Sequence, residues 1–451
     1  MKKGILGDRS FYRSLFVLAI PIALQNLVNS LVNVADTVMI GRLGTVEIAA
    51  VGLGNQFFFL YNMFLFGIVS GGSIFTAQFW GKQDLPGIRK SMGICLVLAL
   101  GMGVIFTAAA LFFPGKIISV YSRDPDVIRA GAVYLRRLFP SFIPYAISFV
   151  FSHAMRSTEK VRLPMITTVI ALSMNMALNY LFIFGAGPIP AMGVAGAAIA
   201  TVISRFVEAA ILVMVSYAAR YVIAGSPGQF LAFNGTYARN FFIIAGPVML
   251  NEMLWSVGIS VQNLIMARTN TDAIAAFNIT ATISQLTWVV FMGLGNGAAV
   301  LIGKKIGAGD EKTARDYAKK ICVFDPLAAL VIALLLIPLA MLIPVLFKVN
   351  AQVLSYTAAM FLILGFSYPF RSFNMTMIVG VCRAGGDTIF CTVYDLVVMW
   401  LISLPLAAAA SFIFHAPVPV IYLCLSLEDP LKSLLGVWRL RSGKWLHNVI
   451  G

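Results

Sequence analysis

The sequence predicts an all-α integral membrane protein whose twelve transmembrane helices form two pseudo-symmetric six-helix lobes around a central cleft. Residues are 60% hydrophobic and only 11% charged, whereas about a quarter of the residues in ordinary globular domains are charged. Apolar runs of roughly twenty residues, the length of a membrane-spanning helix, recur along the whole chain. The pattern of the first run also returns 226 residues later, which indicates a duplicated bundle.

The repeat is clearest in the first helix of each half. Residues 18–42 read LAIPIALQNLVNSLVNVADTVMIGR, and residues 244–268 match them without a gap as IAGPVMLNEMLWSVGISVQNLIMAR. Pro21 falls on Pro247 and Arg42 falls on Arg268. The next span of each half carries corresponding glycines four residues apart, which we interpret as helix-packing positions: Gly67 and Gly71, then Gly293 and Gly297.

Six apolar spans are expected in each half. An even number of spans gives both halves the same orientation, related by an axis along the membrane normal. We therefore expect an N-lobe at 1–218, a cytoplasmic linker at 219–240 and a C-lobe at 241–451. The expected spans lie at about 15–40, 47–79, 91–114, 127–155, 162–186 and 192–218, and then at 241–267, 273–303, 317–347, 352–381, 387–414 and 417–438.

The basic residues predict the orientation. Placing both termini in the cytoplasm puts 23 of the 33 Lys and Arg residues on the cytoplasmic side and 8 on the other side. Such a bias sets the orientation of membrane proteins. It also accounts for the net charge of +15 without a nucleic-acid partner. We expect a multi-pass protein of the plasma membrane, present as a monomer.

Enzyme motifs are missing from the sequence. It contains no phosphate-binding loop, no HExxH and no dinucleotide fingerprint, so we expect neither an enzyme nor a cofactor other than a coupling ion. The five cysteines show no paired spacing, which indicates neither a disulfide framework nor a structural metal site.

Asp36 is the strongest candidate for function in the N-lobe, because a carboxylate within a membrane span is costly to bury. Asn175 and Asn179 lie one helical turn apart in the fifth span, and Thr201 lies in the sixth. Grouped around Asp36, these side chains would form an oxygen-lined pocket for a proton or a sodium ion. No other metal site is predicted.

The C-lobe carries a different acid, Glu252, five residues after Pro247. Arg205, Glu208, Arg371 and Asp395 also fall within spans, and we expect them to form ion pairs or to lie near the water boundary. The candidate residues of the substrate cleft come from the first helices of both halves and from the eighth span: Pro21, Gln25, Asn29, Asn251, Glu252, Trp255 and Gln285.

The chain resembles the multidrug and toxic compound extrusion (MATE) family over nearly its whole length. The resemblance rests on IPIALQNLVNSLVNVADTVMIGRLG, on MNMALNYLFIFG followed by MGVAGAAIATVISR, and on GPVMLNEMLWS. It implies export of cationic, amphipathic drugs in exchange for protons or sodium, with Asp36, Asn175, Asn179 and Thr201 as the ion site. Two departures are visible: relatives often carry aspartate at position 179, and Glu252 lies about one turn before the glutamate of other branches.

The sequence therefore predicts an ion-coupled exporter of small drug-like molecules that works by alternating access in the lipid bilayer. The alternative is a flippase for a lipid-linked precursor, which would need several basic residues in its cleft. Only Arg205 and Arg371 are available for that role. A membrane-embedded transferase would need clustered acids or histidines at a membrane face, and the sequence shows none.

Overall fold

The computed structural model describes residues 8–185, 187–346 and 349–451. The fold is all-α, with no strand in the described part of the chain, and Gly386 and Leu446 form an isolated β-bridge. Ten of the described helical stretches are long and apolar enough to cross a membrane. The two remaining predicted spans, 317–347 and 417–438, coincide with α12 and with the α16–α17 pair. The all-α membrane fold predicted from the sequence is thereby confirmed.

The helices of the first half are α1 (Arg9–Gly41), α2 (Thr45–Lys82), α3 (Leu85–Phe112), α4 (Pro114–Ser119), α5 (Pro125–Leu138), α6 (Phe142–Ser157), α7 (Arg162–Phe184) and α8 (Gly193–Ala218), followed by the short α9 (Pro227–Phe230). Those of the second half are α10 (Gly235–Thr269), α11 (Thr271–Gly307), α12 (Glu311–Leu346), α13 (Ala351–Met375), α14 (Thr388–Val398), α15 (Leu404–Phe412), α16 (Val418–Ser426) and α17 (Glu428–Ser442). A 3₁₀ turn, η2 (Phe139–Ser141), joins α5 to α6, and two π-helical stretches, η3 (Thr376–Arg383) and η4 (Met399–Ser403), follow α13 and α14.

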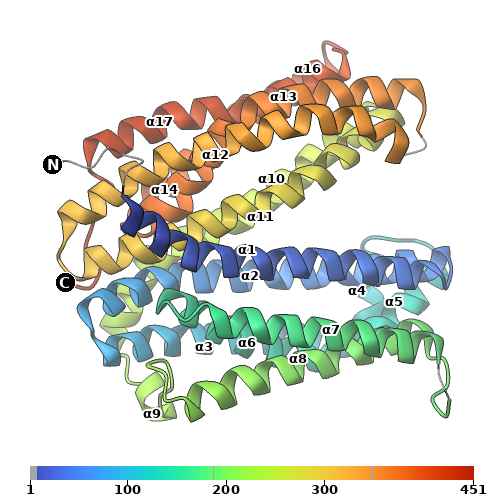
Figure 1. Cartoon of the computed structure of the whole chain (residues 1–451). Helices are drawn as coiled ribbons and strands as arrows, with labels where there is room; N and C mark the ends of the chain where they lie inside the picture. The colour runs from blue at the N-terminus through green and yellow to red at the C-terminus, as the bar shows by residue number, and fades with distance from the viewer. Residues whose placement is uncertain (1–7, 186, 347–348) are drawn as a thin grey trace. The chain divides into compact units, whose positions relative to one another are not determined.

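The chain divides into two compact units. Unit 1 comprises residues 1–23, 81–83 and 246–451, and unit 2 comprises residues 24–80 and 84–245. Within unit 1, α12 and α13 run side by side, and within unit 2, α7 and α8 do so (Figure 1). The boundaries fall inside α1 and α10, close to Pro21 and Pro247. The lobe boundaries at 218 and 241 stay a prediction.

Corresponding glycines let corresponding helices approach closely. A Cβ atom at Gly71 of α2 would lie 2.4 Å from the Cβ of Ala245 on α10, within unit 2. A Cβ atom at Gly297 of α11 would lie 3.4 Å from the Cβ of Ala19 on α1, within unit 1. Both pairs are related by the same offset of 226 residues. The packing role is confirmed for Gly71 and for Gly293, where a Cβ atom would lie 2.9 Å from Ala23, whereas a Cβ atom at Gly297 would make an ordinary van der Waals contact.

The third helix of each half begins with the same cap. Asp84 accepts a hydrogen bond from the backbone N–H of Gly87 at 2.9 Å, and Asp310 accepts one from the backbone N–H of Thr313 at 3.2 Å. Each carboxylate satisfies a donor that the first helical turn leaves without a partner. Hydrogen bonds from the side chain and the backbone N–H of Thr313, together with Lys305, lower the pKa of Asp310.

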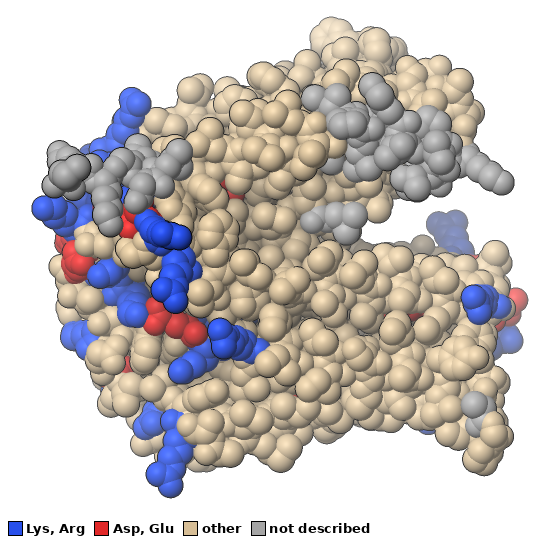
Figure 2. Space-filling model, viewed as in Figure 1, with Lys and Arg blue, Asp and Glu red and all other residues tan. Residues whose placement is uncertain are grey.

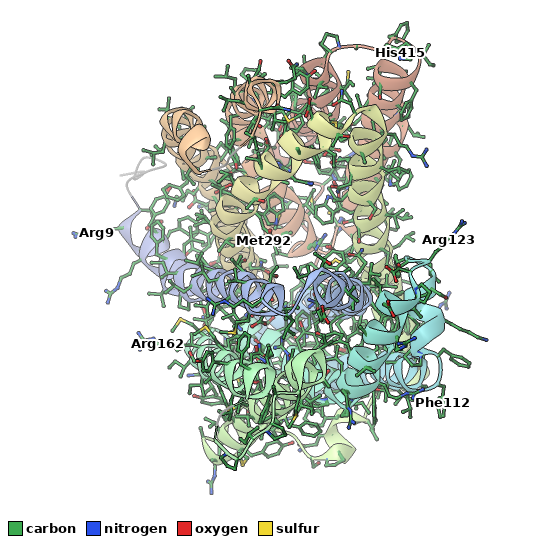
Figure 3. All side chains as sticks on the ribbon, turned by 90° about the vertical axis from the view of Figure 1, so that its right-hand side faces the viewer. Arg9, Phe112, Arg123, Arg162, Met292 and His415 are labelled. Carbon is green, nitrogen blue, oxygen red and sulfur yellow. The ribbon has the colours of Figure 1, made fainter. Side chains whose placement is uncertain are left out.

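Charge is concentrated at one end of unit 1. In unit 1, Lys and Arg gather where α12 begins and where the chain ends (Figure 2). In unit 2, basic residues are not confined to one end, since Arg123 lies at the end opposite the turn between α2 and α3 (Figure 1 and Figure 3). The polarity of unit 1 is the pattern expected of helices that cross a bilayer.

Substitution of Gly93 by alanine should destabilise unit 2, because its Cβ atom would lie 1.8 Å from the carbonyl oxygen of Phe230 on α9. Backbone atoms cannot move aside easily, so overpacking of about 1–3 kcal/mol is expected. Thermal unfolding in detergent measures the effect. Gly101→Ala, on the same helix but with open space around it, is the control. Equal melting temperatures for the two variants would contradict this account of how α9 packs on α3.

Candidate functional site

Asp36, on α1, lies at one end of a chain of side-chain hydrogen bonds in unit 2. Asn179 of α7 donates from Nδ2 to Oδ1 of Asp36 at 2.7 Å and to Oδ1 of Asn175 at 3.2 Å. Nδ2 of Asn175 in turn donates to the hydroxyl of Thr201 on α8 at 3.4 Å. The structure thus brings together the four residues that the sequence grouped, from three different helices. Their role in ion binding stays a prediction.

The Asp36 cluster is buried on its α7 side. Asn175 and Asn179 are 5% and 1% exposed, whereas Asp36 and Thr201 are partly exposed. Oδ1 of Asn179 is buried and accepts no hydrogen bond, so the cluster contains one hydrogen-bond acceptor that has no donor. Among the described residues, no basic side chain lies within ion-pair distance of Asp36, although the charge of Arg205 acts on it from farther away.

A second polar chain in unit 2 links α1, α6, α7 and α8. Arg156 donates to Oε1 of Gln25 at 2.6 Å, and Nε2 of Gln25 donates to the hydroxyl of Thr168 at 2.6 Å. Thr168 donates to Glu208 at 3.1 Å, and Glu208 forms an ion pair with Arg205 at 2.8 Å. The pairing expected for Arg205 and Glu208 is therefore confirmed.

Unit 1 contains the corresponding chain with different charges. Arg383 donates to Oδ1 of Asn251 at 3.0 Å, and Nδ2 of Asn251 donates to Asp395 at 2.9 Å. Asp395 accepts a hydrogen bond from Lys432 at 2.7 Å. Arg383 also forms an ion pair with Glu252 at 2.6 Å.

The two chains occupy equivalent positions of the repeat. Gln25 and Asn251 are 226 residues apart, and the pairs Arg156–Arg383 and Thr168–Asp395 are each 227 apart. Each half therefore uses an arginine to hold an amide just beyond the proline of its first helix. Beyond the amide the chemistry differs, because neutral Thr168 in unit 2 is replaced by an acid with its own lysine in unit 1.

The residues predicted to line a substrate cleft have different environments. Gln25, Asn251 and Glu252 are buried and held in the two polar chains. Pro21, Asn29 and Trp255 are partly exposed, and Gln285 is exposed. Trp288 lies 5.5 Å from the guanidinium of Arg371. The role of these residues in binding substrate stays a prediction.

Sequence reasoning missed several members of these chains. It counted Lys432 and Arg383 as charges at the cytoplasmic boundary, but they are only 4% and 5% exposed. Thr168 was not singled out, because a threonine in a membrane helix most often bonds to its own backbone. The equivalence of Gln25 with Asn251, both amides after a proline, is the signal that could have indicated the two chains.

Buried amides, hydroxyls and ion pairs inside a duplicated bundle of apolar helices define a membrane transporter built from a parallel repeat. Within the described residues, no group of three or more His, Cys, Asp and Glu side chains is placed to hold a metal ion.

Comparison with known proteins identifies the family. The family model MatE matches residues 21–181 and 247–409, and the chain therefore belongs to the MatE family of transporters. It is 23% identical over 444 residues to "Probable multidrug resistance protein NorM" of Thermotoga maritima, covering 97% of this chain and 94% of the relative. It is 27% identical over 445 residues to "Multidrug resistance protein MdtK" of Edwardsiella ictaluri, covering 97% and 92%.

Solved structures share the fold. One described as the outward-facing conformation of a multidrug resistance MATE family transporter of the MOP superfamily has a TM-score of 0.83 at 19% identity, covering 96% of this chain and 97% of that one. A crystal structure of MATE in the straight conformation has a TM-score of 0.83 at 20% identity, with the same coverage.

Replacing Lys432 by methionine should destabilise unit 1, because Asp395 would become a buried carboxylate without its lysine. Breaking a buried pair in this way costs about 3–5 kcal/mol. Thermal unfolding in detergent measures it. The double variant Lys432→Met/Asp395→Asn should recover part of the loss, and exposed Lys444→Met is the control. If Lys432→Met unfolds like the control, the pair has no stabilising role.

Proposed function

We propose that this protein is a secondary active exporter of cationic, amphipathic drug-like compounds, driven by exchange for a coupling ion and working by alternating access. Membership of the MatE family and relatives named as multidrug resistance proteins support export of such compounds. A coupling ion can drive the change between states only through a difference in its affinity for them. The Asp36 cluster supplies a group able to provide that difference.

Protons are the coupling ion that the geometry supports, and the bond between Asn179 and Asp36 is the observation that carries this choice. Nδ2 of Asn179 donates a hydrogen bond to Oδ1 of Asp36. A sodium ion bound at Asp36 would compete with this donor for the carboxylate oxygen. Sodium also favours several oxygen ligands, whereas a proton needs one carboxylate. Once Asp36 is protonated it becomes a donor, and rotation of the Asn179 amide would offer it the unpaired acceptor Oδ1.

Glu252 is less suited to the same role. Its carboxylate is bound to Arg383 at 2.6 Å, so a proton on Glu252 would have to replace this buried ion pair and leave Arg383 without its acid. Asp36 forms no such pair among the described residues. We therefore assign the coupling proton to Asp36, and assign Glu252 to holding α10 against η3.

The flippase alternative is not supported by the two arginines that it would use. Arg205 is paired with Glu208, and Arg371 packs over the ring of Trp288. A pyrophosphate ligand would have to compete with these partners.

The expected surroundings follow from the charge distribution. We propose a multi-pass, monomeric protein of the plasma membrane with both termini in the cytoplasm and two six-helix lobes, since this orientation places 23 of the 33 Lys and Arg residues on the cytoplasmic side. The proposed partners are the lipid bilayer and small-molecule substrates.

Asp36→Asn should abolish drug transport driven by an imposed gradient in proteoliposomes while leaving drug binding intact. The amide has nearly the shape of the protonated acid but cannot exchange a proton. Transport is measured with a fluorescent cationic drug, and binding is measured separately on purified protein. Asp126→Asn, an exposed acid of the same unit, is the control. Undiminished transport by Asp36→Asn would remove Asp36 from the mechanism.

The proposed orientation predicts different labelling of two introduced cysteines. Gly235→Cys and Gly115→Cys both enter open space, the first in the predicted cytoplasmic linker and the second on the opposite side. An impermeant thiol reagent applied to intact cells should label Gly115→Cys alone. Labelling of Gly235→Cys should require permeabilised cells, and labelling without permeabilisation would refute the orientation.

A further inference from the structure

Asp325 is a buried acid in unit 1 that lies outside both polar chains. It sits on α12 and is 0% exposed. The hydroxyl of Thr376, the first residue of the π-helical stretch η3, donates a short hydrogen bond to its Oδ2. Its other oxygen, Oδ1, is fully buried and accepts no well-formed hydrogen bond, although the Ser372 hydroxyl lies close enough to interact with the carboxylate. A membrane helix does not keep such a group without a cost.

No positive charge within the described chain compensates Asp325. The elements packed against α12 are α1, α11, α13 and η3. Lys320, on α12 itself, is paired with Asp8 and Asp316. The basic groups of α13 and η3 are the partly exposed Arg371 and the buried Arg383. Arg371 lies over the Trp288 ring, and Arg383 is bonded to Glu252 and Asn251. Two titratable thiols also lie on these elements. Cys322 lies one turn earlier on α12, and Cys382 lies on η3.

The repeat shows that packing alone does not require this acid. The third helix of the first half is α3, and its residue 226 positions before Asp325 is Ala99, which is also 0% exposed. The same fold position is therefore filled by a methyl group in one half and by a carboxyl group in the other. Pro326, next in the chain, also removes the helical donor of the Cys322 carbonyl, which adds a polar group one turn from the acid.

An isolated carboxylate in an apolar interior is so costly that the group takes up a proton instead. We propose that Asp325 is a second proton-binding site, which holds a proton in this conformation and releases it when water reaches it during the transport cycle. The step converts the carboxylic acid and a water molecule into a carboxylate and a hydronium ion. This inference rests on the proposed function for its place in a cycle, but not for the binding of the proton itself.

The π-helical stretch connects this site to the Glu252 pair. Thr376 begins η3 and Arg383 ends it, and π-helical turns are frequent at functional sites. Loss of the proton would leave a negative charge on Asp325, which needs more hydrogen-bond donors than the Thr376 hydroxyl alone. Either the backbone of η3 or the Ser372 side chain would then have to move to supply them. Arg383 and its partners lie at the other end of the same stretch.

Infrared difference spectroscopy of the purified protein between acid and alkaline pH tests the proposal. The unmodified protein should show the carbonyl band of a protonated carboxyl group that disappears as pH rises, and Asp325→Asn should lack one such band. Thr376→Val should shift the frequency of that band by removing its hydrogen-bond donor, whereas Thr376→Ser should leave it in place. The two threonine variants keep the acid, so they report on Asp325 even if Asp325→Asn does not fold.

Transport supplies the second readout. In proteoliposomes, Asp325→Asn should bind drug normally but lose the dependence of transport rate on pH over the range where the band titrates. A band that is unchanged in Asp325→Asn, or that responds to sodium at constant pH instead of to pH, would overturn the proposal. If the unmodified protein exports no drug in any gradient, the proposed function fails, while the infrared band still decides whether Asp325 binds a proton.

Discussion

The cost of burying polar groups in an apolar helix bundle determines how this protein is built. Each half places an amide, Gln25 or Asn251, just beyond the proline of its first helix, and an arginine from a later helix binds it. Without those arginines the amide oxygens would be buried acceptors lacking partners, which costs about 1–3 kcal/mol each. The bonds also tie the first helix of each half to the helices that carry the acids.

Duplication followed by divergence explains why the acids differ. In unit 2 the chain beyond the amide ends in a self-contained Arg205–Glu208 pair, which leaves Asp36 bonded only to neutral groups among the described residues. In unit 1, Asp395 takes the place of Thr168 and is paired with Lys432, and Glu252 is bound to Arg383. A carboxyl group whose partners are neutral can change its charge more readily than one in an ion pair. The duplicated bundle thus contains an acid that can gain and lose a proton in one half, and acids held in ion pairs in the other.

The sequence was sufficient for the helices, the repeat and the Asp36 cluster, because membrane spans and a one-turn spacing such as Asn175–Asn179 are local signals. It was insufficient for Lys432 and Arg383, which composition alone places at the membrane boundary and which the fold buries. Asp325 was missed although it falls inside a predicted span, since its partner Thr376 is 51 residues away. Pairings between distant helices depend on how those helices pack, and a single sequence does not record this.

The central claim is that the Asp36 cluster, with asparagine at position 179, couples drug export to protons. The most direct measurement is accumulation of a fluorescent cationic drug by proteoliposomes of the unmodified protein, with a proton gradient or a sodium gradient imposed separately. The account predicts that a proton gradient drives accumulation without sodium present. Accumulation that follows the sodium gradient and ignores the proton gradient would contradict it.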